Sequence, residues 1–195
     1  MNGADDFKRE FLVERLTKRV AELGDIDFNR DVFVAGADDV ARVIDACNTL
    51  PFMSEVRLVV FKDVDKLAKQ AAESLVSYVS DPCPTTVLAM TASKLAKNTR
   101  LYKAIAKSAP RAVVDCAPKS RRDLPLQVRE FASSLRLTCT QPAAELLVSY
   151  VGESTVRLYS ELEKIASALG KGAVVDTADV ERFVTRTAEV KPWEF

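Results

Sequence analysis

Glycine, lysine and acidic residues near the start of the chain are the first candidates for chemistry. A phosphate-binding loop needs the pattern Gly-x-x-x-x-Gly-Lys-Ser/Thr, because its backbone amides and its lysine surround the phosphates. The segment from Gly3 to Glu10 contains one glycine and no Gly-Lys-Ser, and its aspartates, Asp5 and Asp6, would repel a triphosphate. We therefore interpret this segment as the N-terminus of a helix that binds no nucleotide.

A second acidic pair, Asp63 and Asp65, follows an apolar run in the sequence. An ATPase would carry an acidic residue directly after the first aspartate to orient the attacking water, and Val64 occupies that position. The two aspartates could instead bind a metal ion by themselves. We favour a structural role, since paired acids after a strand more commonly cap the next helix.

The absence of histidine removes the usual base of a catalytic triad, the commonest metal ligand and the usual pH switch. Ser54, Ser93 and Ser120 are expected in loops, where they would make local turn hydrogen bonds. The cysteines are far apart and form no Cys-x-x-Cys pair, which favours free thiols in a reducing cytosol over a zinc site. They are Cys47, Cys83, Cys116 and Cys139. The sequence therefore predicts no catalytic residue, no metal site and no cofactor.

Charge gives little support for a DNA-binding role. Lysine plus arginine and aspartate plus glutamate each total 28, so the formal net charge is zero. A domain that binds DNA through nonspecific phosphate contacts is usually more basic, so we expect at most weak or indirect DNA contact. Five basic residues at helical spacing could still meet DNA or an acidic partner, although a solvated helix face is the commoner explanation. They are Lys94, Lys97, Arg100, Lys103 and Lys107.

The composition is that of a globular protein, with 48% apolar and 29% charged residues. No stretch approaches the ~18 consecutive apolar residues that suggest a membrane span. The N-terminus carries charged residues early, unlike a signal peptide. We expect a cytoplasmic protein with no membrane contact.

Strand and helix patterns alternate as far as residue 116. Apolar runs predict strands at 31–35, 56–61, 86–90 and 112–116. Apolar residues at helical spacing predict helices at 5–23, 38–50, 67–79 and 98–108. In the second of these helices, one apolar stripe is expected to consist of Val40, Val43, Ile44, Cys47 and Leu50. This alternation predicts a parallel α/β sheet.

The pattern becomes helical after residue 118, with helices predicted at 124–135, 143–151, 155–169 and 178–187. Only 136–140 and 173–175 carry a strand signal. We predict an α/β domain over 1–118, a small helical lid domain over 119–188, and the start of a linker to a further domain over 189–195. A parallel α/β domain followed by a helical lid is AAA+-like in its plan.

The segment from Asn48 to Phe61 joins a predicted helix to a predicted strand. Pro51 disfavours helical angles at Leu50, so the helix is expected to end there. Phe52 and Met53 lie in the break between helix and strand. Bulky apolar side chains at such a corner are either part of the core or a presented binding surface, and the sequence leaves both interpretations open.

At this point the chain resembles the delta subunit of the bacterial DNA polymerase III clamp loader. The resemblance runs along nearly the whole sequence and is carried by several motifs in order. They are the opening Asn-Gly-Ala-Asp-Asp, Thr49-Leu-Pro-Phe-Met-Ser-Glu-Val-Arg-Leu-Val-Val60, Asp63-x-Asp-Lys-Leu67, Pro82-x-Pro-Thr-Thr86, Val113-x-x-Cys116, Gly152 before a helix with Glu161-Leu-Glu-Lys-Ile165, and the final Pro-Trp-Glu-Phe.

The resemblance implies a non-catalytic AAA+ subunit that binds the ring-shaped sliding clamp and opens it, while sister subunits bind and hydrolyse ATP. By family position, Phe52 and Met53 would be a plug that enters an apolar pocket on the clamp, with Leu50 and Pro51 presenting it. The implied partners are the sliding clamp, which is the beta subunit, and the delta prime and gamma/tau subunits of the loader.

The chain departs from the family pattern at three places. Phe52-Met53 stands where the family often has Leu-Phe, only two residues precede Gly3, and the C-terminal collar domain is missing. We therefore expect a fragment that could bind the clamp but not assemble the loader. Two alternatives stay open: an AAA+ ATPase with a degenerate but active nucleotide site, and an α/β scaffold in which Phe52 and Met53 are core. The burial of these two side chains is the deciding observation.

Overall fold

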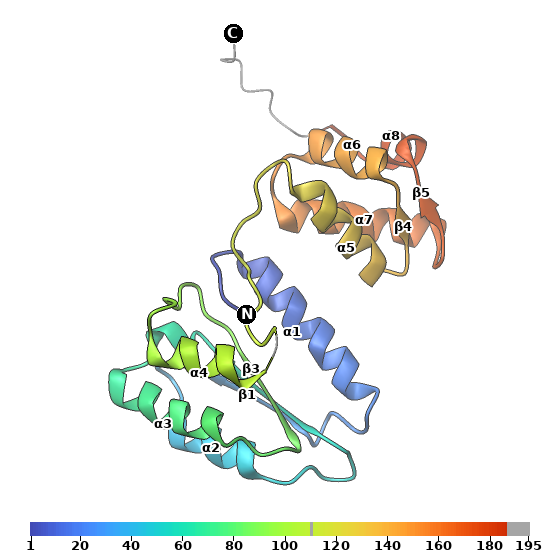
Figure 1. Cartoon of the computed structure of the whole chain (residues 1–195). Helices are drawn as coiled ribbons and strands as arrows, with labels where there is room; N and C mark the ends of the chain where they lie inside the picture. The colour runs from blue at the N-terminus through green and yellow to red at the C-terminus, as the bar shows by residue number, and fades with distance from the viewer. Residues whose placement is uncertain (110, 187–195) are drawn as a thin grey trace. The chain divides into compact units, whose positions relative to one another are not determined.

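The structure, a computed structural model, describes residues 1–109 and 111–186 (Figure 1). The chain divides into two compact units, Met1–Pro118 and Lys119–Phe195. The predicted linker at 189–195 lies outside the described residues. The helix predicted at 178–187 ends already at Phe183, because Val184 has an extended backbone, so the predicted end was wrong. No helix in the described ranges is long and apolar enough to span a bilayer.

The first unit is built on a parallel three-stranded sheet in the order β1 (Arg30–Val34), β2 (Arg57–Lys62) and β3 (Thr86–Met90). The central strand β2 is buried from Arg57 to Phe61, as expected for a nearly continuous apolar run with helices on both faces. The predicted mixed α/β class with a parallel sheet is therefore confirmed.

Alternate residues of β2 supply two separate cores. Leu58 and Val60 pack with Val13 and Val20 of α1 (Asp6–Ala21) on one face. Val59 and Phe61 belong to the core on the opposite face, with residues of α2 (Val40–Asn48), α3 (Lys69–Ser80) and α4 (Arg100–Ser108). Figure 1 shows α1 on one side of the sheet and the other three helices on the opposite side. The sheet is thereby held rigidly between two helical layers.

The predicted strand at 112–116 does not form as a regular strand. Asn2 makes isolated parallel bridges with Ala92 and Asp115. The Asn2 N–H donates to the Val114 carbonyl (2.9 Å), and the Cys116 N–H donates to the Asn2 carbonyl (2.8 Å). Asn2 pairs with one residue in each of two segments, Ala92 and Asp115. These are isolated bridges, so no continuous ladder forms here. The apolar run at 112–116 correctly located a segment that pairs with its neighbour, but it did not predict that the pairing is limited to an isolated bridge.

Helix α2 ends two residues earlier than the sequence predicted. Asp39 caps its start, accepting from the Ala41 N–H (3.0 Å), and Thr49 is already extended at its C-terminus. Val43 and Cys47 of the predicted stripe are fully buried, but Leu50 lies beyond the helix and is exposed. The prediction that Leu50 continues the apolar stripe was wrong, because the helix ends at Asn48 and Leu50 is no longer helical.

The second unit consists of α5 (Leu124–Ser134), β4 (Thr138–Cys139), α6 (Gln141–Val151), α7 (Thr155–Leu169), β5 (Val174–Val175) and α8 (Thr177–Phe183). The two short strands pair in parallel. Side chains from α5, α6 and α7 form its core, including Phe131, Leu147, Leu158, Leu162 and Ile165. The last helix starts at a capping box formed by Asp176 and Asp179. The unit is mostly helical, as the sequence predicted.

Candidate functional site

The apolar corner, defined as Leu50, Pro51, Phe52 and Met53, projects from the junction between α2 and β2. Leu50 is 72% exposed, Phe52 59% and Met53 83%, whereas Pro51 is half-buried. Adjacent apolar side chains with this exposure are unusual on a surface that has no partner. The alternative in which Phe52 and Met53 are core residues is therefore wrong.

Local backbone bonds shape the start of the corner. The Thr49 hydroxyl donates to the Asp45 carbonyl (2.8 Å), which closes the last turn of α2. After Pro51 the chain reaches Met53, which has a left-handed φ of +49°. A side chain with a Cβ is strained there by on the order of 1 kcal/mol. The strain shows that the surrounding fold dictates where Met53 is displayed.

Asn29, which precedes β1, is the residue that fixes the corner from below. It is completely buried. Its Oδ1 accepts from the Phe52 N–H (2.6 Å), and its Nδ2 donates to the Phe52 carbonyl (2.7 Å) and to the Asp25 carbonyl (2.6 Å). Both backbone polar groups of Phe52 are thus satisfied by one side chain. Sequence reasoning missed Asn29, because no local pattern signals a bond across 23 residues.

Phe28 brings a further aromatic ring to the corner. It is 67% exposed, and its ring lies edge-to-face against that of Phe52, with centroids 6.1 Å apart and planes at 74°. An antiparallel bridge between Gly24 and Ser54 joins the same two segments. The exposed apolar surface therefore comes from two stretches of chain, and sequence reasoning identified only the second.

The predicted phosphate-loop position is closed by the protein's own groups. Gly3 has φ of +151°, and a Cβ there would lie 2.0 Å from the Cys116 carbonyl carbon. Asp5 caps α1 by accepting from the Lys8 N–H (2.9 Å). The Arg9 guanidinium donates to the Gly3 carbonyl and pairs with Asp6. A carboxylate therefore sits at the helix N-terminus where a phosphate would bind.

The acidic pair after β2 is engaged in local structure. Asp63 accepts from Lys66 Nζ (2.8 Å) but makes no capping bond, so the predicted capping role is wrong for this residue. Asp65 accepts from the Ser93 N–H (3.0 Å) and hydroxyl (2.6 Å), a bond across the unit rather than the local turn expected of Ser93. Burial raises the pKa of Asp65, but these hydrogen bonds outweigh it, so the pKa lies below its ordinary value.

We next looked for side chains that could bind a metal ion in the part of the chain that the structure describes. No group of three or more His, Cys, Asp or Glu residues there could hold a metal ion. The four cysteines are free thiols, and burial raises the pKa of Cys47 to about 11. Burial also raises the pKa of Cys116 and Cys139, so these three buried thiols are poor nucleophiles or ligands at neutral pH. Half-exposed Cys83 differs, because hydrogen bonds with Thr85 lower the pKa of its thiol.

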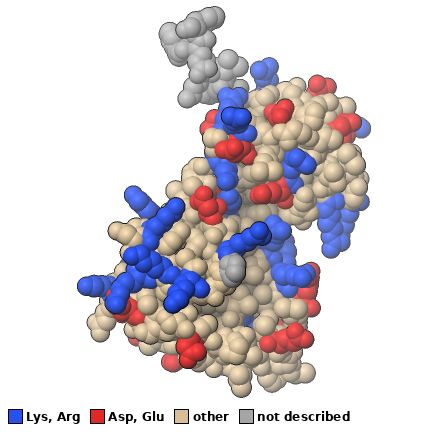
Figure 2. Space-filling model, viewed as in Figure 1, with Lys and Arg blue, Asp and Glu red and all other residues tan. Residues whose placement is uncertain are grey.

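The predicted basic face is divided between a loop and a helix. Arg100, Lys103 and Lys107 lie on α4, and Lys94 and Lys97 precede it. All five are exposed, and Arg100 pairs with Glu73 of α3 (2.7 Å). Figure 2 shows Lys and Arg side chains gathered over the α4 region of the first unit. The face is positively charged and exposed to solvent. This is compatible both with an acidic partner and with a solvated helix face.

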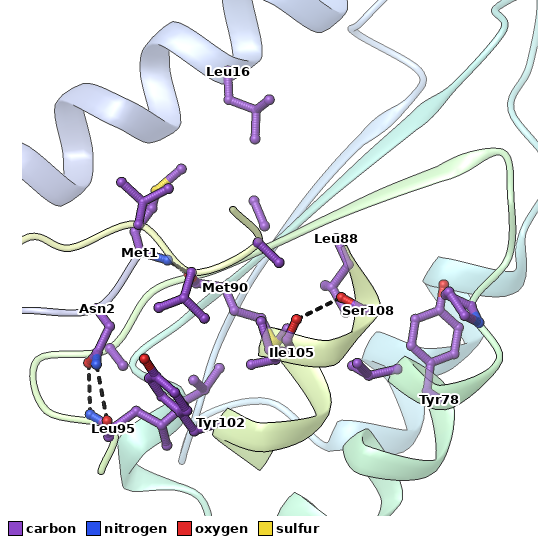
Figure 3. Close-up of a pocket in the computed structure, with 18 of the residues that line it drawn as sticks. Met1, Asn2, Leu16, Tyr78, Leu88, Met90, Leu95, Tyr102, Ile105 and Ser108 are labelled. Atoms are coloured by element: carbon purple, nitrogen blue, oxygen red, sulfur yellow. Dashed lines mark hydrogen bonds between the residues drawn. The ribbon is translucent and has the colours of Figure 1, made fainter. Parts of the chain in front are cut away.

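An apolar cavity of about 430 Å³ lies beside β3. Figure 3 shows Met1, Met90, Tyr102 and Ile105 around it. Two of its polar side chains are paired: the Asn2 amide bonds both the N–H (2.8 Å) and the carbonyl (3.0 Å) of Leu95, and the Ser108 hydroxyl donates to the Ile105 carbonyl. Among the described residues that line it, we identify no group of polar side chains arranged for chemistry.

Comparison with known proteins gives one consistent result. Residues 1–116 match the family model described as DNA polymerase III, delta subunit. The DNA polymerase III subunit delta of Bacillus subtilis is 27% identical over 202 residues, which cover 98% of this chain and 58% of that protein. This chain therefore spans less than two thirds of that relative's length.

Solved structures agree with this match. The Bacillus subtilis DNA clamp loader delta protein superposes with a TM-score of 0.78 at 27% identity, covering 95% of this chain and 57% of that one. A point variant of Thermotoga maritima RuvB has a TM-score of 0.50 at 13% identity, covering 93% of this chain and 59% of that one, and shows likeness of fold alone.

Proposed function

This chain belongs to the DNA polymerase III delta subunit family, and from that premise we propose that its apolar corner binds the sliding clamp and helps to open the ring during DNA replication. The observation that carries the proposal is the contrast in burial within one short stretch. Phe52 and Met53 are 59% and 83% exposed, whereas Leu58 to Phe61 are completely buried. The fold thus presents two large apolar side chains that contribute little to its own core.

The size and position of these side chains suit a small binding hot spot. Burying a Phe or Met side chain in a partner's apolar pocket is worth roughly 1.5–3 kcal/mol. Aromatic anchors in a desolvated pocket commonly dominate binding. Because Pro51 and the Asn29 bonds restrain the backbone, little conformational freedom would be lost on binding. Leu50 and Pro51 border the anchors and belong to the same clamp-binding surface.

The chain acts as a non-catalytic subunit in this proposal. The Asp5 carboxylate and the Arg9 bonds occupy the place of a nucleotide's phosphates, and Val64 stands where the water-orienting acid would be. ATP binding and hydrolysis then fall to partner subunits of the loader, gamma/tau and delta prime, in the bacterial cytoplasm. Contact with DNA is weak or indirect, through the basic residues on and before α4.

The test measures binding of the chain to an immobilised bacterial sliding clamp. Replacing Phe52 and Met53 together by alanine is expected to weaken binding by about 100-fold, since two hot-spot side chains are lost. Leu126→Ala, which removes a side chain that is 61% exposed in the second unit, is the matched control and should bind like the wild type. Clamp binding that is absent in the wild type, or unchanged in the double variant, overturns the proposal.

Ring opening and nucleotide binding need separate measurements. If the chain opens the ring, it should release clamp from circular DNA, and the double variant should not. A labelled ATP analogue with magnesium should not bind. Micromolar binding of that analogue would instead favour the alternative, an AAA+ ATPase with a degenerate but active nucleotide site.

A further inference from the structure

Resting on the proposed function, we propose that the clamp-binding surface is built from two segments, with Phe28 as a further contact residue and Asn29 as the residue that positions Phe52. Both lie directly before β1, more than 20 residues from the apolar corner in sequence. The two segments meet at three points: the Gly24–Ser54 bridge, the Asn29 bonds and the Phe28–Phe52 ring contact.

Asn29 is suited to a positioning role by its burial and its bonds. A side chain amide has one acceptor and two donor hydrogens, and Asn29 uses both kinds on the backbone of Phe52. Its other bond goes to Asp25, within its own loop. Its own backbone is fixed to the sheet, since the Leu58 N–H donates to the Asn29 carbonyl (2.8 Å). Asn29 therefore links the rigid central strand to the exposed corner.

Phe28 is suited to direct contact. It sits next to Asn29 in sequence, so the loop that buries the amide also displays the ring. Its 67% exposure exceeds that of Phe52. The edge-to-face contact holds the two rings together while leaving much of both in solvent. A partner that covers Phe52 would therefore also meet Phe28, provided that it approaches from the same side.

The chemistry of the surface favours an apolar pocket rather than a charged one. Five side chains, those of Phe28, Leu50, Pro51, Phe52 and Met53, are apolar and adjoin along the two segments. The polar groups beneath them, on Asn29 and the Phe52 backbone, are already paired. A partner therefore gains from covering the surface without having to satisfy buried polar atoms.

The first arm of the test concerns contact. Phe28→Ala is expected to weaken clamp binding about tenfold, a usual loss for an interface aromatic. Leu126→Ala serves again as the control for loss of an exposed apolar side chain. If the wild type binds and the Phe52/Met53 double variant does not, but Phe28→Ala binds like the control, the proposed function stands and the further inference fails. If the wild type itself does not bind, both fail.

The second arm concerns positioning and uses a double-mutant cycle. Asn29→Ala should weaken binding about tenfold in the wild-type background but only about twofold when Phe52 is already alanine, because Asn29 acts through Phe52. Equal losses in both backgrounds would show that Asn29 does not act through that residue. Exchange of the Phe52 amide hydrogen should also accelerate in the Asn29 variant, a change that a contact residue alone would not cause.

An isosteric variant tests the Nδ2 donor of Asn29, and urea unfolding of each Asn29 variant shows whether it is folded. Asn29→Asp keeps the Oδ1 acceptor for the Phe52 N–H and removes the Nδ2 donor to the Phe52 carbonyl. Because the oxygen that replaces Nδ2 would face the Phe52 and Asp25 carbonyls in a fully buried site, Asn29→Asp is expected to bind no more tightly than Asn29→Ala. Asn48→Ala, at an exposed asparagine at the end of α2, is the matched control and should leave binding unchanged. Wild-type affinity in Asn29→Asp would overturn the positioning role.

Discussion

Two turns of the first unit, both next to a helix end, use their residues in opposite ways. The turn from Gly3 to Arg9 is folded inward: Asp5 caps α1, and Arg9 bonds the Gly3 carbonyl. The apolar corner is folded outward: Asn29 satisfies the backbone of Phe52, and the side chains of Leu50, Phe52 and Met53 are exposed. A turn whose charged groups satisfy one another has little left for a ligand. A turn whose backbone is satisfied from beneath can display apolar side chains to a partner.

The two turns differ in whether their residues stabilise the fold or are exposed for binding. The Gly3 turn is held by contacts with Cys116 that admit no side chain. At the corner the printed hydrogen bonds of Phe52 are made by its backbone, while the side chains of Leu50, Phe52 and Met53 stay largely exposed. Substitutions should therefore affect stability at the first place and binding at the second.

The largest effect is expected for the core strand that follows the corner. Phe61 is completely buried, so Phe61→Ala should lower the free energy of unfolding by about 3–5 kcal/mol. Met53→Ala, a few residues earlier at 83% exposure, should change it by no more than about 0.5 kcal/mol. Urea unfolding of both variants measures the difference. A loss of several kcal/mol in Met53→Ala would remove the distinction between core and surface.

The next largest effect is expected at the inward turn. An added Cβ at Gly3 would meet the backbone of Cys116 at 2.0 Å, so Gly3→Ala should destabilise by about 1–3 kcal/mol. Gly36 also has positive φ, at +89°, but nothing lies within 4 Å of the position of its Cβ. Gly36→Ala is therefore the control, with a loss of about 1 kcal/mol from backbone strain alone. Equal losses would mean that Gly3 is not closely packed.

The corner offers a substitution whose effects on stability and binding should have opposite signs. Met53→Gly removes the strain of a φ of +49°, so stability is expected to rise by up to about 1 kcal/mol. The same change removes a proposed anchor, so clamp binding should weaken. Thermal unfolding and clamp binding, measured on one preparation, test both halves. A variant that is both less stable and fully binding would contradict this account of the corner.

The smallest effect concerns Asp65, whose pKa is lowered by the bonds from Ser93 despite burial. A carboxyl group with a lowered folded pKa stabilises the fold above its unfolded pKa, about 3.9, and this stabilisation is lost as the pH falls through the folded value. Ser93→Ala should therefore lower stability by about 0.5 kcal/mol at pH 7. The difference should shrink at acidic pH. A difference that is independent of pH would assign the loss to something other than Asp65.

The sequence predicted those parts of the fold that depend on local patterns. The apolar run before Lys62 indicated a strand buried on both faces, and Pro51 indicated the end of the preceding helix to within two residues. Asp5 and Asp6 indicated a helix start unsuited to phosphate. Each of these follows from residues that are neighbours along the chain, so a single sequence is enough to find them.

Contacts between distant segments could not be predicted in the same way. The bonds from Asn29 to Phe52 and from Ser93 to Asp65 join residues 23 and 28 positions apart. Asparagine and serine in a loop are equally compatible with solvent exposure, so neither carries a signal of its own. The strand predicted at 112–116 failed for a similar reason, since a ladder depends on which segment lies beside it. The position of the apolar corner was therefore predictable from the sequence, but the Asn29 hydrogen bonds that hold Phe52 were not.

The most direct test of the central claim is oxidation of the three methionines, with and without the sliding clamp. Met53 is 83% exposed, while Met1 and Met90 are only partly exposed. Dilute peroxide followed by mass spectrometry reports the oxidation rate at each residue. We predict that Met53 is oxidised fastest in the free chain, and that saturating clamp slows it several-fold while Met1 and Met90 are unaffected. An unchanged rate at Met53 when the clamp is bound would contradict the account.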